Sequence, residues 1–367
     1  MEIIQFKPFV LLLTLSSCAS SSNTRNLKQR LEEIREKNSL PGLTAGLFVD
    51  GAPKSLSAVG VRKVGFEDKL TEDDKFHIGS CSKSVTAMLA ATFVDENKVK
   101  WKSRLSELFP ELKLHSELKD VKFEDLLAHR SGLITNPEDK WYGELSKLEI
   151  VEARKELSEV LLTQRPAFKP YSFNYSNSGY IIAGHILERI SKKSWETLIS
   201  ERIFRPLGMS SCGFGPTSDP EESTPTQPWG HFDIDGVFIA NQGDNPAFYG
   251  PSGSIHCNLK DWAKFLNMHF ESVNASTKLV SAESLKKLHS TYPEEGSDYT
   301  YGGWLQLERS WARGMVLTHA GSNVSNYANV WLAPEKKAIL ISTSNSGGEA
   351  AGKATNDVIV ELILSEL

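Results

Sequence analysis

The segment FHIGSCSKSVTA, residues 76–87, places hydroxyl, thiol and amine side chains in front of an apolar run. Ser80 and Lys83 form a Ser-x-x-Lys motif, and on a helix this spacing puts both side chains one turn apart on the same face. A lysine in a partly desolvated site can have its pKa lowered enough to accept the serine proton, which would make Ser80 a nucleophile. The alternative is that these serines are ordinary helix-start residues, because serine oxygens accept hydrogen bonds from free N–H groups there.

The spacing alone does not decide between these interpretations, because the motif occurs twice more in the chain, at Ser116 with Lys119 and at Ser284 with Lys287. Both further copies lie in charge-rich segments that are typical of surface helices. Only Ser80 follows a glycine that permits a tight approach and opens a strongly apolar helix. The neighbouring Cys81 is interpreted as a packing residue, since one step along a helix turns a side chain by about 100°.

A second motif, Tyr175-Ser176-Asn177, could add a proton-transfer group and a substrate-binding amide. A phenol can shuttle protons, and the amide of Asn177 can both donate and accept hydrogen bonds. A similar copy at residues 327–329 alternates within NYANVWLA, as a core strand does. The first copy lies in a Ser/Asn-rich loop before a helix, where side chains can point into a cleft.

A third motif, His319-Ala320-Gly321-Ser322, ends the apolar run MVLTHAG. A glycine at such a strand allows another backbone to approach closely, and the N–H of Ser322 could then polarise a substrate carbonyl. The alternative is a plain strand end with a partly buried histidine.

The three motifs, taken in this order, resemble the serine β-lactamase and penicillin-binding protein superfamily, whose boxes are Ser-x-x-Lys, Ser-Asp-Asn and Lys-Thr-Gly. The Tyr-x-Asn form is similar to the class C β-lactamase and DD-peptidase branch. The likeness runs from about Leu27 to the C-terminus. Four further segments match at family-typical places: LPGLTAGLFVDG (40–51), LLAHRSGL (126–133), RPLGM (205–209) and GPSGSIHCNLKDWAKFL (250–266).

This resemblance implies that Ser80 is the nucleophile that becomes acylated, which leaves Ser82 and Ser84 as helix-start residues. Lys83 and Tyr175 would form the proton-transfer pair, and either of them could be the base for acylation. Asn177 would hold the amide side chain of the substrate. The backbone N–H groups of Ser80 and Ser322 would form the oxyanion hole, which matches the tetrahedral intermediate better than the ground state.

The third box departs from the Lys-Thr-Gly of most β-lactamases, because His319 replaces the lysine ahead of Gly321. A histidine is largely neutral near pH 7, so it is a weaker anchor for a substrate carboxylate. This form looks like some DD-peptidases, D-aminopeptidases and esterases of the family. The resemblance therefore implies an acyl-enzyme hydrolase for D-amino-acid peptides (a carboxypeptidase) or esters, with β-lactam hydrolysis less expected. The alternatives are a penicillin-binding or sensing envelope lipoprotein without efficient turnover, or a structural lipoprotein. The physiological substrate stays open.

The elements that must position these residues read as an α+β fold. An amphipathic helix begins at Leu27, and two β-rich runs flank the hairpin signal Asp50-Gly51. Strands return near residues 315–345, and an amphipathic helix closes the chain. We expect one antiparallel sheet built from both chain ends and flanked by helices, with a mostly helical inserted subdomain. The sheet subdomain would span 27–104 and 247–367, and the helical one 105–246.

The N-terminus predicts export. Residues 1–18 contain a short apolar stretch that suits a secretory signal but not a membrane span, which takes about 20 residues. The ending Leu-Ser-Ser-Cys resembles a lipobox, with lipid attached at Cys18 and residues 19–26 as a Ser-rich tether. We expect a lipoprotein of the bacterial cell envelope, on the periplasmic face of the outer membrane if the source is Gram-negative.

Composition excludes other classes. With a net charge of -5 and interspersed charges, the 367-residue chain has no basic footprint for nucleic acid. No Cys-x-x-Cys unit occurs, so neither a zinc site nor a disulfide framework is indicated. We expect no metal and no cofactor, a small-molecule, peptide or ester substrate, and contact with the membrane through the anchor only. The oligomeric state and the pairing of Cys212 with Cys257 stay open.

Overall fold

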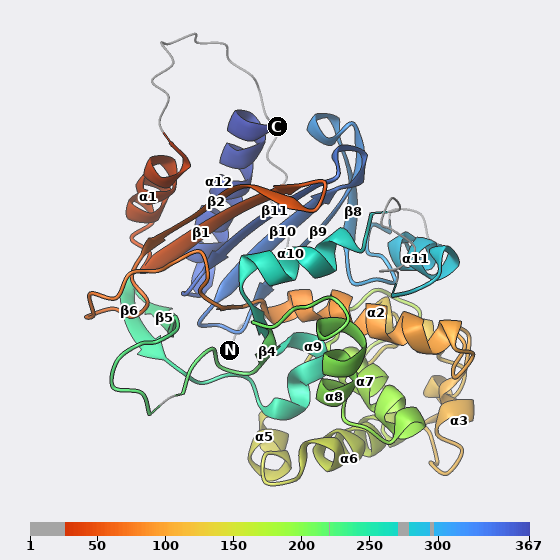
Figure 1. The fold of residues 1–367 in the computed structure, drawn as a ribbon. Helices are drawn as coiled ribbons and strands as arrows, with labels where there is room; N and C mark the ends of the chain where they lie inside the picture. The colour runs from red at the N-terminus through yellow and green to blue at the C-terminus, as the bar shows by residue number, and fades with distance from the viewer. Residues whose placement is uncertain (1–25, 220, 271–278, 294–296) are drawn as a thin grey trace.

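The fold is taken from a computed structural model that describes residues 26–219, 221–270, 279–293 and 297–367 (Figure 1). The predicted signal peptide, the lipid-attachment residue Cys18 and all but the last residue of the tether lie outside the described residues. Within these ranges, no helix combines the length and apolar character that crossing a bilayer requires.

A six-stranded antiparallel sheet forms the centre of the molecule, and its strands come from both ends of the chain. The strand order is β2-β1-β11-β10-β9-β8. The hairpin predicted at Asp50-Gly51 is present, and both turn residues have positive φ. The predicted sheet architecture is therefore confirmed. The strands are β1 (Gly42–Val49), β2 (Ala52–Gly60), β8 (Leu305–Arg309), β9 (Gly314–Ser322), β10 (Tyr327–Ala333) and β11 (Ala338–Ser344).

Helices cover both faces of this sheet (Figure 1). On one face, α1 (Leu27–Lys37) and α12 (Gly348–Glu366) bury an apolar layer that includes Leu47 and Leu340. On the other face, α10 (Leu259–Asn267) packs on the sheet, and α2 (Ser82–Asp95) lies beyond it in the largest core. The sheet thus separates α1 and α12 from the helical layer.

The middle of the chain supplies the helical layer around α2, which is buried along nearly its whole length. A small sheet of order β3-β7-β4 joins this layer to the segment before Ser80. The helices are α3 (Leu105–Leu108), α4 (Phe123–Leu127), α5 (Asp139–Leu145), α6 (Ile150–Thr163), α7 (Asn177–Ser191), α8 (Trp195–Ile199), α9 (Gly250–Gly253) and α11 (Ala282–His289). The small strands are β3 (Phe76–His77), β4 (Gly213–Phe214) and β7 (Ile255–Cys257).

One part of the predicted helical insert is a hairpin instead. Strands β5 (Gly230–Ile234) and β6 (Val237–Asn241) pair through a turn at Asp235 and Gly236. Both turn residues have positive φ, 51° and 82°, as a two-residue type I′ turn requires. The Asp-Gly pair between alternating apolar residues in HFDIDGVFIA is the local signal that specifies it.

The structure also pairs the two cysteines whose state the sequence left open. Cys212, next to β4, forms a disulfide with Cys257 at the end of β7, across a separation of 45 residues. Because β7 pairs with β3, this crosslink lies in the layer that leads directly to the segment carrying Ser80.

Candidate active site

Ser80 lies in a single 3₁₀ turn, Gly79–Cys81, between β3 and α2, and its side chain is partly exposed. The turn packs against the end of β9 so closely that a Cβ on Gly79 would lie 2.3 Å from the backbone N of Ser322. A Cβ on Gly321 would lie 2.1 Å from the carbonyl oxygen of Ile78 and 2.7 Å from the backbone N of Ser80. Only glycine fits at both positions, and the backbone N–H groups of Ser80 and Ser322 are thereby brought side by side.

Lys83 lies one turn further along and is fully buried. Its Nζ donates hydrogen bonds to Ser80 Oγ (3.0 Å) and to the carbonyl oxygen of Ser252 (2.7 Å). Burial lowers the pKa of Lys83 well below its usual value. A neutral amine beside a partly exposed hydroxyl can accept the proton of that hydroxyl.

Tyr175 stands beside this pair and is partly exposed, with its ring 4.9 Å from Lys83 Nζ. Burial raises the pKa of the Tyr175 phenol, and its hydrogen bond with Ser80 opposes that change only in part. At neutral pH this tyrosine is therefore a neutral phenol, which can donate a proton more readily than it can accept one.

Asn177 is the first residue of α7, whose N-terminus is capped by Ser176 Oγ, which accepts from Gly179 N–H at 3.0 Å. The amide nitrogen of Asn177 donates to Asn136 Oδ1 at 2.7 Å. Its Oδ1 is buried and accepts no hydrogen bond from any residue that the structure describes. An acceptor of this kind is suited to an N–H donor such as a substrate amide.

His319 is buried near the end of β9, with its ring between two side chains. Nδ1 lies 3.9 Å from Cys81 Sγ, and Nε2 lies 3.5 Å from the hydroxyl of Tyr299. Burial lowers the pKa of His319 to about 3, so the ring is neutral at physiological pH. The pairing of β8 with β9 covers residues 314–318 and stops one residue before His319.

Several groups at this site were not assigned a role from the sequence. His129 accepts a hydrogen bond from Ser176 N–H at 3.0 Å, and its ring lies 4.2 Å from that of Tyr175 and 4.7 Å from that of Tyr299. His129 and Ser252 lie within LLAHRSGL and GPSGSIHC, two segments noted only as family-typical. Tyr299 had no signal of its own, because its proximity to His319 arises from the tertiary fold.

The remaining polar residues of the opening segment are structural. Cys81 is a free, buried cysteine, and burial raises the pKa of its thiol far above the usual value, so it is no rival nucleophile. Ser82 is the first residue of α2, as predicted, and its Oγ accepts from the N–H of Ile255 in β7 at 3.1 Å. Ser84 Oγ donates to the carbonyl oxygen of Cys81 at 2.8 Å.

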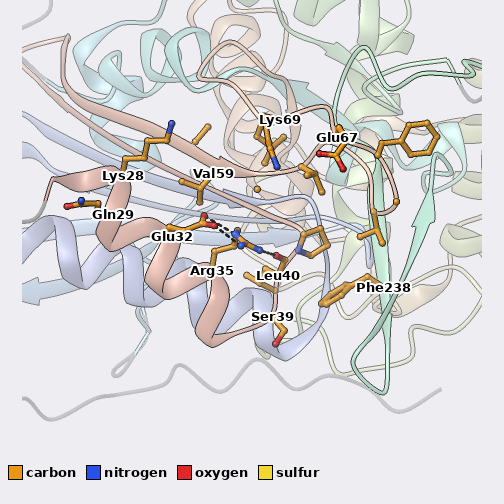
Figure 2. Close-up of a pocket in the computed structure, with 18 of the residues that line it drawn as sticks. Lys28, Gln29, Glu32, Arg35, Ser39, Leu40, Val59, Glu67, Lys69 and Phe238 are labelled. Atoms are coloured by element: carbon orange, nitrogen blue, oxygen red, sulfur yellow. Dashed lines mark hydrogen bonds and ion pairs between the residues drawn. The ribbon is translucent and has the colours of Figure 1, made fainter.

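A groove of about 910 Å³ lies elsewhere, between α1, β2 and the loop that follows β2 (Figure 2). Its prominent cation, Arg35, is already engaged with Glu32 at 2.7 Å and with the carbonyl oxygen of Leu40 at 2.8 Å. None of the predicted site residues lines this groove. In the part of the chain that the structure describes, no group of three or more His, Cys, Asp or Glu side chains could hold a metal ion.

Comparison with known proteins identifies the family of this chain. The model of the family described as "Beta-lactamase" matches residues 27–364. Penicillin-binding protein 4 of Amycolatopsis lactamdurans is 25% identical over 262 residues, covering 70% of this chain and 67% of that protein. An unguisins hydrolase of Aspergillus campestris is 28% identical over 180 residues, covering 47% of this chain. This chain spans only 33% of that hydrolase.

A solved structure with the same fold is the D-amino acid amidase of Ochrobactrum anthropi, complexed with L-phenylalanine amide. The TM-score is 0.70 at 22% identity, with 92% of this chain and 97% of that chain covered. At this level of identity the likeness establishes the fold.

Proposed function

This chain belongs to the Beta-lactamase family, and from that premise we propose that it is a serine hydrolase that forms an acyl-enzyme on Ser80. One observation carries the proposal: a partly exposed hydroxyl is hydrogen-bonded to a fully buried lysine whose pKa is lowered by burial. A lysine kept neutral in this way is a base matched to a serine nucleophile.

In the first half of the proposed reaction, Ser80 Oγ attacks the carbonyl carbon of the substrate and its proton passes to the amine of Lys83. The carbonyl oxygen becomes an oxyanion that accepts hydrogen bonds from the N–H groups of Ser80 and Ser322. The bond to the leaving group then breaks, and the leaving group takes a proton through the hydroxyl of Tyr175, which regains one from Lys83. This leaves an ester between Ser80 and the acyl group.

In the second half, water attacks that ester and gives its proton to the same neutral base. The bond to Ser80 Oγ breaks, the acid is released, and the serine regains its proton. Lys83 is the base favoured here over Tyr175, because burial lowers the pKa of the amine but raises that of the phenol.

The substrate class follows from His319. A buried imidazole with a pKa of about 3 supplies no positive charge for a carboxylate. We therefore propose an ester or an amide that presents no free carboxylate to His319, such as a short-chain ester or a D-amino-acid amide. A β-lactam and a D-amino-acid peptide with a free C-terminal carboxylate are disfavoured on the same ground. The names of the relatives, which include a penicillin-binding protein, a hydrolase and a D-amino acid amidase, support amide or ester cleavage without fixing the substrate.

The test is to map the acylated residue. A serine-reactive fluorophosphonate should modify the peptide that contains Ser80, as read by mass spectrometry, and no adduct there would overturn the proposal. Among nitrocefin, a chromogenic short-chain ester and a D-Ala-D-Ala peptide, the ester should be cleaved fastest, because it alone presents no carboxylate. A fluorescent penicillin that labels Ser80 without release, with no turnover of the other substrates, would support the sensing alternative.

We further propose that the protein is exported and lipid-anchored at Cys18. The apolar stretch and the Leu-Ser-Ser-Cys ending support this, and the Cys212–Cys257 disulfide suits an oxidising compartment. Metabolic labelling with a palmitate analogue should tag the wild-type protein but not Cys18→Ala. Equal labelling of both would overturn the anchor.

A further inference from the structure

We propose that His77, Asp244 and Asn323 form a positioning bridge that holds the two N–H groups of the oxyanion hole in register. This inference rests on the proposed function, because it assigns a role to residues around that same site. None of the three reaches the reacting atoms in the proposal. They act through the backbone of the residues next to Ser80 and Ser322.

The first half of the bridge starts at the nucleophile. The backbone N–H of Gly79, which directly precedes Ser80, donates to His77 Nδ1 at 3.1 Å. Because Nδ1 accepts this bond, the ring N–H that faces Asp244 is on Nε2. Nε2 then donates to Asp244 Oδ2 at 2.9 Å. The imidazole is thus fixed at both nitrogens.

The second half reaches the other arm of the hole. Asn323 Nδ2 donates to Asp244 Oδ1 at 3.0 Å, and Asn323 directly follows Ser322. Burial alone would raise the pKa of Asp244, but its bonds to His77 and Asn323 hold that pKa below its usual value, so the carboxylate accepts at both oxygens. Asp244 lies on the segment after β6, outside both arms.

The bridge is shielded from water. The exposed fraction of the side chain is 2% for His77 and 5% for Asp244, and Asn323 is 8% exposed. Hydrogen bonds to a charged group in such a low-dielectric environment are stronger and more directional than the same bonds at the surface. The bridge can therefore fix a geometry that the loop would not otherwise keep.

The loop after Ser322 needs such support. Val324 has a φ of +76°, a conformation that β-branched residues rarely adopt. Backbone strain of this kind persists only when the surroundings impose it. Ser322 Oγ accepts from the N–H of Val324 at 3.0 Å, and Asn323 Oδ1 accepts from Asn326 Nδ2 at 3.2 Å, so the anchored Asn323 lies in the middle of the strained turn.

Three variants separate the halves of the bridge. In His77→Asn the amide oxygen can replace Nδ1 toward Gly79, but the link to Asp244 is lost. In His77→Gln the terminal amide can replace Nε2 toward Asp244, but the acceptor for Gly79 is lost. Asp244→Ala removes the carboxylate that links His77 to Asn323. His185→Gln is the matched control, because His185 is also buried beside a carboxylate, Glu188, but in the helical layer.

The readout compares phenyl acetate with its thionoester, in which sulfur replaces the carbonyl oxygen. An oxyanion hole shaped for oxygen penalises the larger sulfur, so the oxygen-to-sulfur ratio of kcat reports the geometry of the hole. We expect each bridge variant to lower kcat for the oxygen ester about 10- to 100-fold, with KM little changed. The oxygen-to-sulfur ratio of kcat should decrease in the bridge variants and stay at the wild-type value in His185→Gln.

The outcomes separate the two proposals. Unchanged kcat in the bridge variants, or a lower kcat with an unchanged oxygen-to-sulfur ratio, would overturn the bridge and leave the proposed function standing. A decreased oxygen-to-sulfur ratio of kcat in His185→Gln would also overturn the bridge, because a general loss of stability would then explain the effect. Wild-type protein that cleaves neither ester and gives no Ser80 adduct with a fluorophosphonate would overturn the proposed function and the bridge with it.

Discussion

Two segments of this protein carry the same Ser-x-x-Lys spacing in opposite surroundings. On α11, Ser284 Oγ donates to Asp95 Oδ1 at 2.6 Å, and Lys287 Nζ lies 2.9 Å from a carboxylate oxygen of Glu124. Lys287 is partly exposed and also lies over the ring of Tyr301, 3.4 Å from its centroid. At the other site, Lys83 is fully buried, and its hydrogen bonds go to a hydroxyl and a carbonyl oxygen.

The difference indicates that the environment, and not the spacing, decides whether a Ser-x-x-Lys pair is suited to nucleophilic chemistry. A carboxylate and an aromatic face both favour the charged form of a lysine, and a charged lysine cannot accept a proton. Burial without a carboxylate partner favours the neutral form. On α11 the same two residue types form a hydrogen bond to Asp95 and an ion pair with Glu124. At the start of α2 they form the pair that we propose as nucleophile and base.

The largest effect should come from removing the hydroxyl of Ser80, with removal of the hydroxyl of Ser284 as the control. We expect Ser80→Ala to lower kcat/KM for a chromogenic ester by about 10⁴-fold or more, because the covalent step is lost. Ser284→Ala should leave activity at the wild-type level. Steady-state kinetics on both purified variants would decide, and equal activity of Ser80→Ala and wild type would contradict the mechanism.

The second test replaces each of the two lysines by arginine. Arginine stays protonated at all accessible pH values, so Lys83→Arg should lower kcat by about 10²–10⁴-fold, whereas Lys287→Arg should leave it unchanged. Because burial lowers the pKa of Lys83, wild-type activity should fall as acidification protonates it. A pH–rate profile that lacks this acidic limb would contradict Lys83 as the base.

A smaller effect should appear in stability at acid pH. The folded-state pKa of His319 is about 3, against about 6.5 for an unfolded histidine. The contribution of the neutral His319 ring to the free energy of unfolding is therefore fully present above about pH 6.5 and is lost as pH falls toward 3. At pH 5 this loss is about 2 kcal/mol. Denaturant unfolding at pH 7 and pH 5 should show a smaller decrease in the free energy of unfolding for His319→Gln than for wild type. His115→Gln, at a partly exposed histidine, is the control and should behave like wild type. An equal decrease in all three proteins would contradict this prediction.

The smallest effect is expected at the surface copy. Glu124→Gln removes the charge partner of Lys287, and pairs with one partly exposed member contribute little. The free energy of unfolding should fall by about 1 kcal/mol or less, with kcat unchanged. A loss of activity in this variant would show that α11 is coupled to the site, against the comparison drawn above.

Much of this molecule was predictable from the sequence, because its signals are local. The sheet from both chain ends follows from alternating apolar runs, and Gly321 marks a close backbone approach that the structure shows at Ser80. The hairpin β5–β6 was predictable too, since Asp235-Gly236 is a local turn signal that the helical interpretation passed over.

Other features required the tertiary structure. The carbonyl oxygen of Ser252 reaches Lys83 from 169 residues away, and the hydroxyl of Tyr299 reaches His319 from another segment of the chain. No periodicity or spacing reports such contacts. The burial that lowers the pKa of Lys83 is likewise a property of the assembled core.

The position of α1 has a consequence for orientation. This helix packs on the sheet face shared with α12, while α2 and the turn that carries Ser80 lie on the other side of the sheet (Figure 1). The chain therefore enters the described fold at Leu27 on the face of the sheet opposite the turn that carries Ser80, so the six-stranded sheet lies between the first helix and the candidate active site.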